Sequence, residues 1–215
     1  MRDVFIVGTG GLARETAQIL KLLQINGEIG KFAGYISQDN EEIGKELVHG
    51  EVVGTDATIS FVEEDIDIVI AIGYPSIKKK VAYLYESQRN THFPNIIDPR
   101  ANIDPTGFKI GSGNIITCGS YSSSQVSIGN FNLVNWNATI GHDARVGSYC
   151  VINPGAHISG LSIINDSVLI GAGAVVLERI NICQNVIIGA GAVVTKDINE
   201  AATYIGIPAQ KALKK

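Results

Sequence analysis

Cysteine is scarce in this 215-residue sequence, and the three that occur, Cys118, Cys150 and Cys183, lie far apart. An odd number of cysteines without CxxC spacing argues against both a disulfide framework and a cysteine-based zinc site. We therefore expect reduced thiols, as in a cytoplasmic protein, and no bound metal.

Long apolar runs and an excess of one charge are also absent. The longest apolar stretch, 66–72, is interrupted by Asp67 and is far too short to span a bilayer. The first residues lack the long apolar segment and small-residue cleavage site of a signal peptide. The net charge of −4 gives no general nucleic-acid footprint. We expect a soluble cytoplasmic protein that binds neither membranes nor nucleic acids.

The sequence is rich in a six-residue repeat of branched apolar residues. Every sixth residue from Ile110 to Val194 is Ile or Val, with Ser122 as the one exception. A helix would repeat near 3.6 residues and a flat strand near two, so a period of six requires another architecture. Such repeats are typical of parallel β-helices, in which three hexapeptides close one triangular coil. The repeat predicts five stacked coils, with inward-facing small or slim residues four positions after the anchors: Ser120, Val126, Ala138, Ala144, Cys150, Ala156, Ser162, Val168, Ala174, Val186 and Ala192.

The residues before the repeat have the pattern of a small parallel α/β domain. An apolar segment at 4–7, a glycine-rich turn at 8–11 and a helical pattern at 12–23 form the opening of a βαβ unit. Further elements are predicted as strands over 31–36, 65–72 and 92–97 and a proline-initiated helix over 75–88. We expect a Rossmann-like domain over 1–97, with ligand-facing loops at the carboxyl ends of its strands, and a β-helix domain with a C-terminal cap over 98–215.

The turn Gly8-x-Gly10-x-x-Ala13 fits the dinucleotide-binding fingerprint, which keeps an NAD-linked oxidoreductase open as an alternative. That fingerprint expects an acidic residue about 20 positions further on. Here Ser37-Gln38-Asp39 closes the second predicted strand, and only Asp39 is acidic. Glycines that admit an anion to a helix N-terminus serve a nucleotide-sugar diphosphate as well as NAD. A tight turn without a ligand also fits.

Within the coil, the informative residues are those that the repeat does not need. His142 follows a predicted strand and is next to Asp143, and the positions 18 residues away hold Ser124 and Gly160. Small neighbours would leave the imidazole accessible, and an adjacent carboxylate can fix its tautomer and make it a better proton acceptor. A surface pair without a catalytic role fits the same residues.

A second candidate feature is one corner column of the coil, with members at 18-residue steps: Trp136, Pro154, Ala172 and Ala190. Ala172 and Ala190 stand between glycines. A side with little bulk and open backbone amides could accept the thin pantetheine arm of coenzyme A. Small residues could equally serve only to make tight corners.

Two sets of motifs resemble a known family. The runs that begin Ile170-Gly-Ala-Gly-Ala-Val and Ile188-Gly-Ala-Gly-Ala-Val, with Gly206-Ile-Pro-Ala, resemble the left-handed β-helix (hexapeptide) acyltransferases. The run from Asn135 through Ile-Gly-His142-Asp143 to Gly147 resembles sugar acetyltransferases of the sialic-acid O-acetyltransferase and bacillosamine-pathway N-acetyltransferase type. The resemblance spans nearly the whole chain and implies a left-handed coil.

The resemblance also implies roles for individual residues. His142 would be the general base, Asp143 would raise its basicity, and Asn135 would lie near the acceptor sugar. The nucleotide would be held by Gly10, Gly11, Leu12, Ser37, Gln38 and Gly73, and acetyl-CoA by Gly160, Ala172 and Ala190 in a groove between two subunits of a homotrimer. Two departures stand out: the family often has two acidic residues where Ser37-Gln38 stand, and many members have a second histidine at the position of Val151.

We therefore expect an acetyl-CoA-dependent N-acetyltransferase for surface glycan (O-antigen) biosynthesis. Its substrate would be a UDP- or dTDP-linked 4-amino-4,6-dideoxyhexose, whose amine attacks the thioester directly with no metal involved. The alternatives are a sugar O-acetyltransferase of the sialic-acid type, the NAD-linked oxidoreductase, and a non-catalytic trimeric module.

Overall fold

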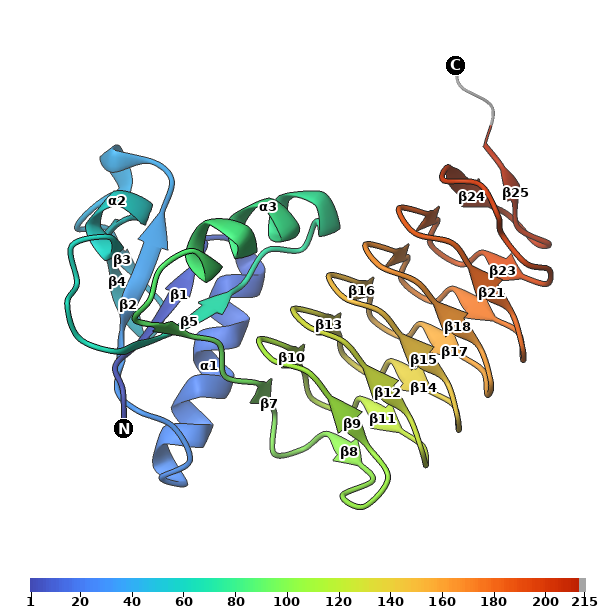
Figure 1. Cartoon of the computed structure of the whole chain (residues 1–215), viewed down its shortest axis with the longest axis horizontal. Helices are drawn as coiled ribbons and strands as arrows, with labels where there is room; N and C mark the ends of the chain where they lie inside the picture. The colour runs from blue at the N-terminus through green and yellow to red at the C-terminus, as the bar shows by residue number, and fades with distance from the viewer. Residues whose placement is uncertain (213–215) are drawn as a thin grey trace.

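The N-terminal half of the chain is built on one twisted sheet, next to which the second half forms a triangular coil (Figure 1). The structure, a computed structural model, describes residues 1–212, so the last three residues of the predicted second domain lie outside it. Among the described residues, no helix has the length and apolar character needed to cross a membrane.

The sheet has six strands in the order β3-β4-β2-β1-β5-β6. The strands are β1 (Val4–Val7), β2 (Phe32–Ser37), β3 (Glu46–Leu47), β4 (Gly50–Thr55), β5 (Ile66–Ile70) and β6 (Thr91–His92). Neighbouring strands pair in parallel, except that β3 pairs antiparallel with β4. Because β1 pairs with both β2 and β5, the strand order reverses at β1, and ligands of open α/β sheets bind at such a switch point.

Helices α1 (Gly11–Ile25) and α3 (Pro75–Glu86) follow β1 and β5, with the short elements η1 (Asn40–Glu42) and α2 (Asp56–Ile59) between them. Gly8 links β1 to α1 at φ +116°, and a side chain there would approach the carbonyl oxygen of Ala71 at 3.1 Å. Only glycine fits that turn without strain. Pro75 starts α3, where its missing N–H costs nothing.

The predicted strands at 4–7, 31–36 and 65–72 and both predicted helices are present, but the expected strand over 92–97 is wrong. That segment is divided: His92 ends β6 in the α/β sheet, whereas Ile96 begins β7, the first strand of the coil. Pro94 removes a ladder donor between the two pieces, which favours a break there.

The coil has three faces of parallel two-residue strands. The first face contains β7 (Ile96–Ile97), β10 (Ile115–Ile116), β13 (Leu133–Val134), β16 (Val151–Ile152), β19 (Leu169–Ile170), β22 (Ile187–Ile188), the cap strand β24 (Thr203–Ile205) and its antiparallel partner β25 (Gln210–Lys211). The second face contains β8 (Asn102–Ile103), β11 (Tyr121–Ser122), β14 (Thr139–Ile140), β17 (His157–Ile158), β20 (Val175–Val176) and β23 (Val193–Val194). The third face contains β9 (Lys109–Ile110), β12 (Ser127–Ile128), β15 (Arg145–Val146), β18 (Ile163–Ile164) and β21 (Asn181–Ile182).

The stacking step is 18 residues, as the hexapeptide period predicts. Val134 pairs with Ile152, which pairs with Ile170, and the other faces keep the same step. Every anchor is buried except Ile110, which is partly buried in the first coil, and the small residues four positions later are all buried. Full burial of an Ile or Val side chain contributes about 1.5–3 kcal/mol, so this column is the main source of the coil's stability.

Each corner of the coil turns through a residue in the left-handed conformation, three positions after each anchor. We name the corners from their residues in one coil: the first corner is 135–138, the second 141–144 and the third 147–150. At the first corner the left-handed residue is usually glycine, as at Gly173, whereas at the second it is never glycine, as at Asp143 (φ 59°). Asp and Asn tolerate this conformation better than most residues, so Asp143 fits the turn without much strain.

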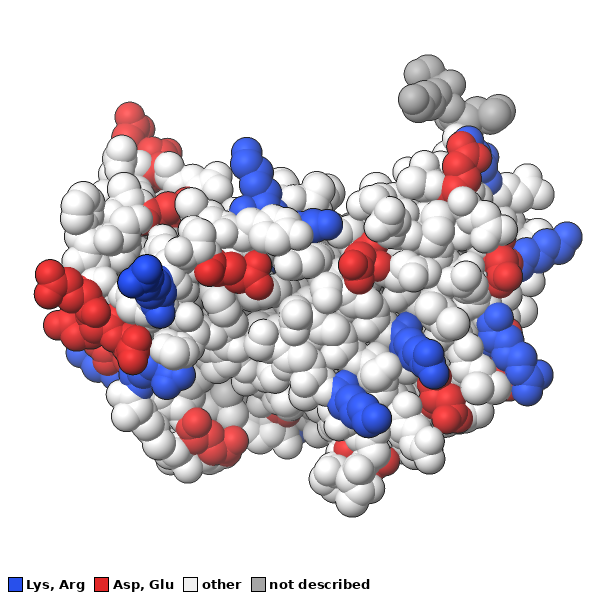
Figure 2. All heavy atoms as spheres, in the orientation of Figure 1, with Lys and Arg blue, Asp and Glu red and all other residues white. Residues whose placement is uncertain are grey.

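An aromatic cluster attaches helix α3 to the third corner of the coil. The rings of Phe131 and Tyr149 stack with centroids 5.6 Å apart, and Phe93 meets Phe131 edge-on at 5.0 Å. From α3, Tyr83 lies 6.1 Å from the Tyr149 ring and the Lys79 ammonium lies 5.6 Å from it. Space-filling spheres show charges of both signs scattered over this side of the molecule, with mostly uncharged residues where the two halves meet (Figure 2).

Candidate active site

His142 stands at the second corner, two residues after the end of β14. Its Nδ1 lies 2.9 Å from Oδ2 of Asp143, and the two side chains are 53% and 45% exposed. Because a carboxylate can only accept a hydrogen bond, Nδ1 carries the proton of the neutral imidazole, which leaves the lone pair on Nε2. The pair therefore presents an accessible proton acceptor at the edge of the coil.

The next coil of the β-helix packs against this imidazole at Gly160. A Cβ at Gly160 would lie 2.6 Å from Nε2 of His142, so any larger residue at this position would displace the ring. The corner backbone is fixed on both sides, since the Asp143 N–H donates to the Ser124 carbonyl at 3.1 Å and the Leu161 N–H donates to the His142 carbonyl at 2.8 Å. The expectation of small neighbours around His142 is confirmed, and Gly160 lies directly against the ring.

Asn135 lies at a different corner from His142. It stands at the first corner, where its Oδ1 accepts from the backbone N–H of Trp136 at 2.9 Å and from Thr117 Oγ1 at 3.4 Å. The indole of Trp136 is 42% exposed beside it. Strand β14 runs from the Asn135 corner to the His142 corner, so within one chain the two residues are at opposite ends of one short strand.

Ala172 and Ala190 are exposed at the first corner, in the column with Trp136 that the sequence predicted. The glycines that follow them, Gly173 and Gly191, have positive φ angles, and nothing lies within 4 Å of where a side chain would be. This edge is slim, as the coenzyme A hypothesis requires. Gly160, the third residue assigned to acetyl-CoA, is at the second corner instead, so the three do not form one column.

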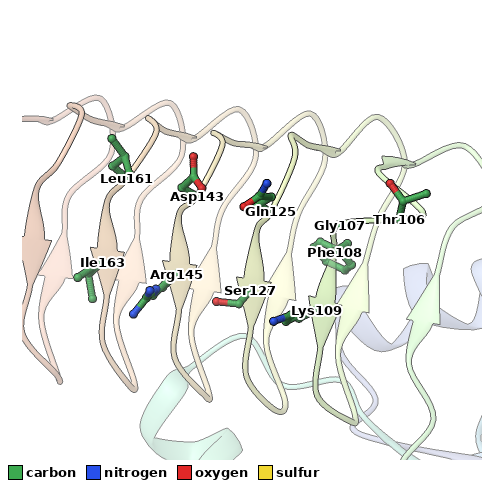
Figure 3. A pocket seen from close by; sticks show the side chains of 10 residues that line it. All are labelled: Thr106, Gly107, Phe108, Lys109, Gln125, Ser127, Asp143, Arg145, Leu161 and Ile163. Carbon is green, nitrogen blue, oxygen red and sulfur yellow. The ribbon is translucent and has the colours of Figure 1, made fainter.

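A hollow of about 920 Å³ lies along the third face and was not predicted (Figure 3). Asp143 stands at its rim, between Gln125 and Leu161, and the outward side chains of Lys109 and Arg145 lie on the strands beside it. The sequence signal was present, because Lys109, Ser127 and Arg145 each precede an inward-facing anchor and must point outward. A groove open to solvent nevertheless has no periodic signature.

The predicted nucleotide residues gather at the carboxyl edge of the α/β sheet. Gly10, Gly11 and Gly73 all face open space, and Gly10 is the N-cap of α1 without a side-chain cap, which leaves the first backbone N–H groups of the helix available to an anion. Ser37 ends β2 beside this turn, followed by exposed Gln38, whereas Leu12 is partly buried against the core.

One residue at this edge was missed from the sequence. The carboxylate of Glu42, in η1, accepts hydrogen bonds from Ser37 Oγ at 2.7 Å and from Thr9 Oγ1 at 2.8 Å. It thereby joins the end of β2 to the glycine-rich turn. No local pattern marks it, because its partners are five and 33 residues away.

The described residues, 1–212, contain no group of three or more His, Cys, Asp or Glu side chains placed to hold a metal ion. The candidate residues lie in three separate places: the sheet edge, the second corner with His142, and the first corner with Ala172 and Ala190. Within the described chain, no hydrogen bond connects the sheet edge with His142.

Comparison with known proteins gives three results. Residues 3–85 match the family described as the PglD N-terminal domain. No curated protein matches the sequence. Among solved structures, the acetyltransferase domain of PglB from Neisseria gonorrhoeae is 25% identical, with a TM-score of 0.89 over 99% of this chain and 100% of that chain.

Two further solved structures are similar over their whole length. WeeI from Acinetobacter baumannii is 25% identical, with a TM-score of 0.84 over 99% of this chain and 100% of that chain. PerB from Caulobacter crescentus, solved with CoA and GDP-perosamine, is 24% identical, with a TM-score of 0.86 over 99% of this chain and 98% of that chain. These matches confirm the predicted fold, a small α/β domain followed by a left-handed parallel β-helix. In this fold and in its PglD-type N-terminal domain, the chain is similar to the left-handed β-helix acetyltransferases.

Proposed function

We propose that this protein transfers the acetyl group of acetyl-CoA to the amine of a nucleotide-linked amino sugar, most simply a 4-amino-4,6-dideoxyhexose. The observation that carries the proposal is the His142–Asp143 pair, with its hydrogen bond of 2.9 Å and a free Nε2. The uncapped N-terminus of α1 supports a diphosphate site. The relative PerB, solved with CoA and GDP-perosamine, adds GDP to UDP and dTDP as a nucleotide to be tested.

The proposed chemistry needs one base and one hydrogen-bond donor for the oxyanion. The sugar amine attacks the thioester carbonyl carbon while Nε2 of His142 accepts the amine proton. As the carbonyl re-forms, the carbon–sulfur bond breaks, and the imidazolium returns the proton to the departing thiolate. Asp143 keeps the protonated Nδ1 oriented and stabilises the imidazolium. A backbone N–H beside the groove would stabilise the oxyanion, the interaction that usually contributes most to such reactions.

The scaffold suits this role because it keeps the base immobile. Burial of the anchor Ile140 and the two backbone hydrogen bonds at the corner fix the position of His142, while Gly160 leaves room for its ring. We propose that the protein is a homotrimer and that the pantetheine arm of acetyl-CoA lies in a groove between two subunits. The slim edge at Ala172 and Ala190 would form one side of that groove. This arrangement would bring together groups that lie apart in one chain.

The test is an acetyl-transfer assay with acetyl-CoA and UDP-, dTDP- and GDP-linked amino sugars, read as thiol release and as product mass. His142→Ala should lower turnover by about 10²- to 10⁴-fold with an unchanged melting temperature. The matched control is His157→Ala, which removes another exposed coil histidine, whose Nδ1 lies 2.9 Å from Thr139 Oγ1. A His142→Ala enzyme with nearly full activity, or transfer only to the hydroxyl of a free sugar, would contradict the proposal.

A further inference from the structure

Glu42 occupies the place where a doubly wound domain needs a carboxylate. In such folds, an acidic residue at the end of the second strand, beside the glycine-rich turn, accepts a hydrogen bond from the ribose 2′-hydroxyl. In this chain the end of β2 is Ser37, which cannot serve as that acid. The structure instead brings Glu42 to within 2.7 Å of Ser37 Oγ and 2.8 Å of Thr9 Oγ1, so a carboxylate from η1 stands at that edge.

The loop that carries Glu42 is built to hold it there. The Asp39 carboxylate caps η1 by accepting from the Glu41 N–H at 2.9 Å, while Ser37 Oγ accepts from the Asp39 N–H at 3.0 Å. Asp39 is therefore engaged in the fold of the loop. Lys45 closes the arrangement, with its Nζ 2.9 Å from the other oxygen of Glu42.

Glu42 also keeps capacity for a ligand. A carboxylate has about four acceptor positions, and three are used by Ser37, Lys45 and Thr9. The side chain is 25% exposed, so a ligand hydroxyl can reach it. The hydrogen bonds from Ser37, Lys45 and Thr9 lower the pKa of the Glu42 carboxyl to about 2, which keeps it ionised in any ordinary buffer.

We propose that Glu42 is a specificity-determining residue of the nucleotide site and accepts a hydrogen bond from the 2′-hydroxyl of the ribose. The inference rests on the proposed function, because it assumes that a nucleotide binds at this edge. This hydrogen bond would favour ribonucleotides, such as UDP or GDP, over deoxyribonucleotides, such as dTDP. A residue that only stabilised the loop would affect both kinds of nucleotide equally.

The experiment measures dissociation constants by calorimetry for two pairs, UDP with 2′-deoxy-UDP and GDP with 2′-deoxy-GDP. The full-length wild type should bind the ribose member of at least one pair about tenfold more tightly. Glu42→Gln should abolish most of this preference and leave the affinity for the deoxy member unchanged. The amide oxygen can still accept from Ser37 and Thr9, but the amide nitrogen cannot accept from a hydroxyl.

Glu41→Gln is the matched control, since it removes a charge from the same loop at an exposed position, and it should keep the preference. If Glu42→Gln does not fold, Glu42→Asp, which retracts the charge by one methylene, should weaken the same preference. An equal affinity for both members in the wild type, or a preference that survives in the folded Glu42 variant, would overturn the inference alone. A wild type that binds neither pair would overturn the proposed function with it.

Discussion

The stability of this protein should depend on pH through one buried amine. Lys78, on α3, is 1% exposed, and among the described residues its Nζ has no hydrogen-bond partner. Burial lowers the pKa of Lys78 to about 7, only partly offset by the nearby Cys150 thiol. In the unfolded chain a lysine titrates at about 10.4, so the folded protein disfavours the charged form.

The size of the effect follows from that difference. Between pH 7 and about 10.4 the unfolded chain binds a proton at Lys78 that the folded chain lacks, so the free energy of unfolding rises with pH across this window. The gap of about three pKa units corresponds to a destabilisation on the order of 4 kcal/mol at and below pH 7, which disappears above pH 10.4.

The assay is thermal unfolding of the wild type and Lys78→Met at pH 7, 8, 9 and 10. Methionine keeps the apolar length of the side chain without its charge, so the variant should melt on the order of 10 °C higher at pH 7 and approach the wild type near pH 10. Burial raises the pKa of the Cys150 thiol to about 12, which acts in the opposite direction above pH 9 but is common to both proteins. Lys80→Met, on the exposed face of the same helix, is the control. A difference between Lys78→Met and wild type that stays constant from pH 7 to 10 would refute the reasoning.

Three further changes test the site and its support. Asp143→Asn should lower kcat by about 10- to 100-fold and shift the pH profile of kcat, with no loss of stability because asparagine tolerates the left-handed turn. An unchanged pH profile would argue that Asp143 does not control the tautomer of His142. Gly160→Ala should reduce kcat by a similar factor, since its Cβ would lie 2.6 Å from Nε2 of His142, and a crystal structure with the ring undisplaced would contradict this. Tyr149→Ala should lower the free energy of unfolding by roughly 3 kcal/mol, measured by denaturant titration, because it removes the ring stacked on Phe131; a loss under 1 kcal/mol would show that the cluster contributes little.

The coil was predictable in detail because its local and global patterns agree. Each anchor occupies the same position in its coil, as Ile140 and Ile158 do in two neighbouring coils. The period alone therefore predicted the strand positions, the stacking step and the inward-facing residues. The same 18-residue step places Ser124 and Gly160 on either side of His142 from the sequence alone. The resemblance to a family supplied the handedness, which no period contains.

The α/β domain was predictable only in its long elements. Strand β4, Gly50–Thr55, was missed because its buried residues, Val52 and Gly54, make too short an alternation to stand out between glycines. Nothing in the sequence around Lys78 marks it as buried, because its burial depends on how the two halves pack. Neither strand β4 nor the burial of Lys78 gives a recognisable pattern in the local sequence.

The contrast between the two halves explains why the proposed catalytic pair was found from the sequence and the proposed nucleotide-binding carboxylate was not. At the second corner the repeat does not set the side chains at the positions of His142 and Asp143, so an ionisable pair there stands out from the pattern. In the loop after β2 nothing is periodic, and Glu42 gains its place only through hydroxyl partners on other elements. Substrate specificity can therefore change in that loop without disturbing the coil, whereas a change beside His142, as at Gly160, acts on the base directly.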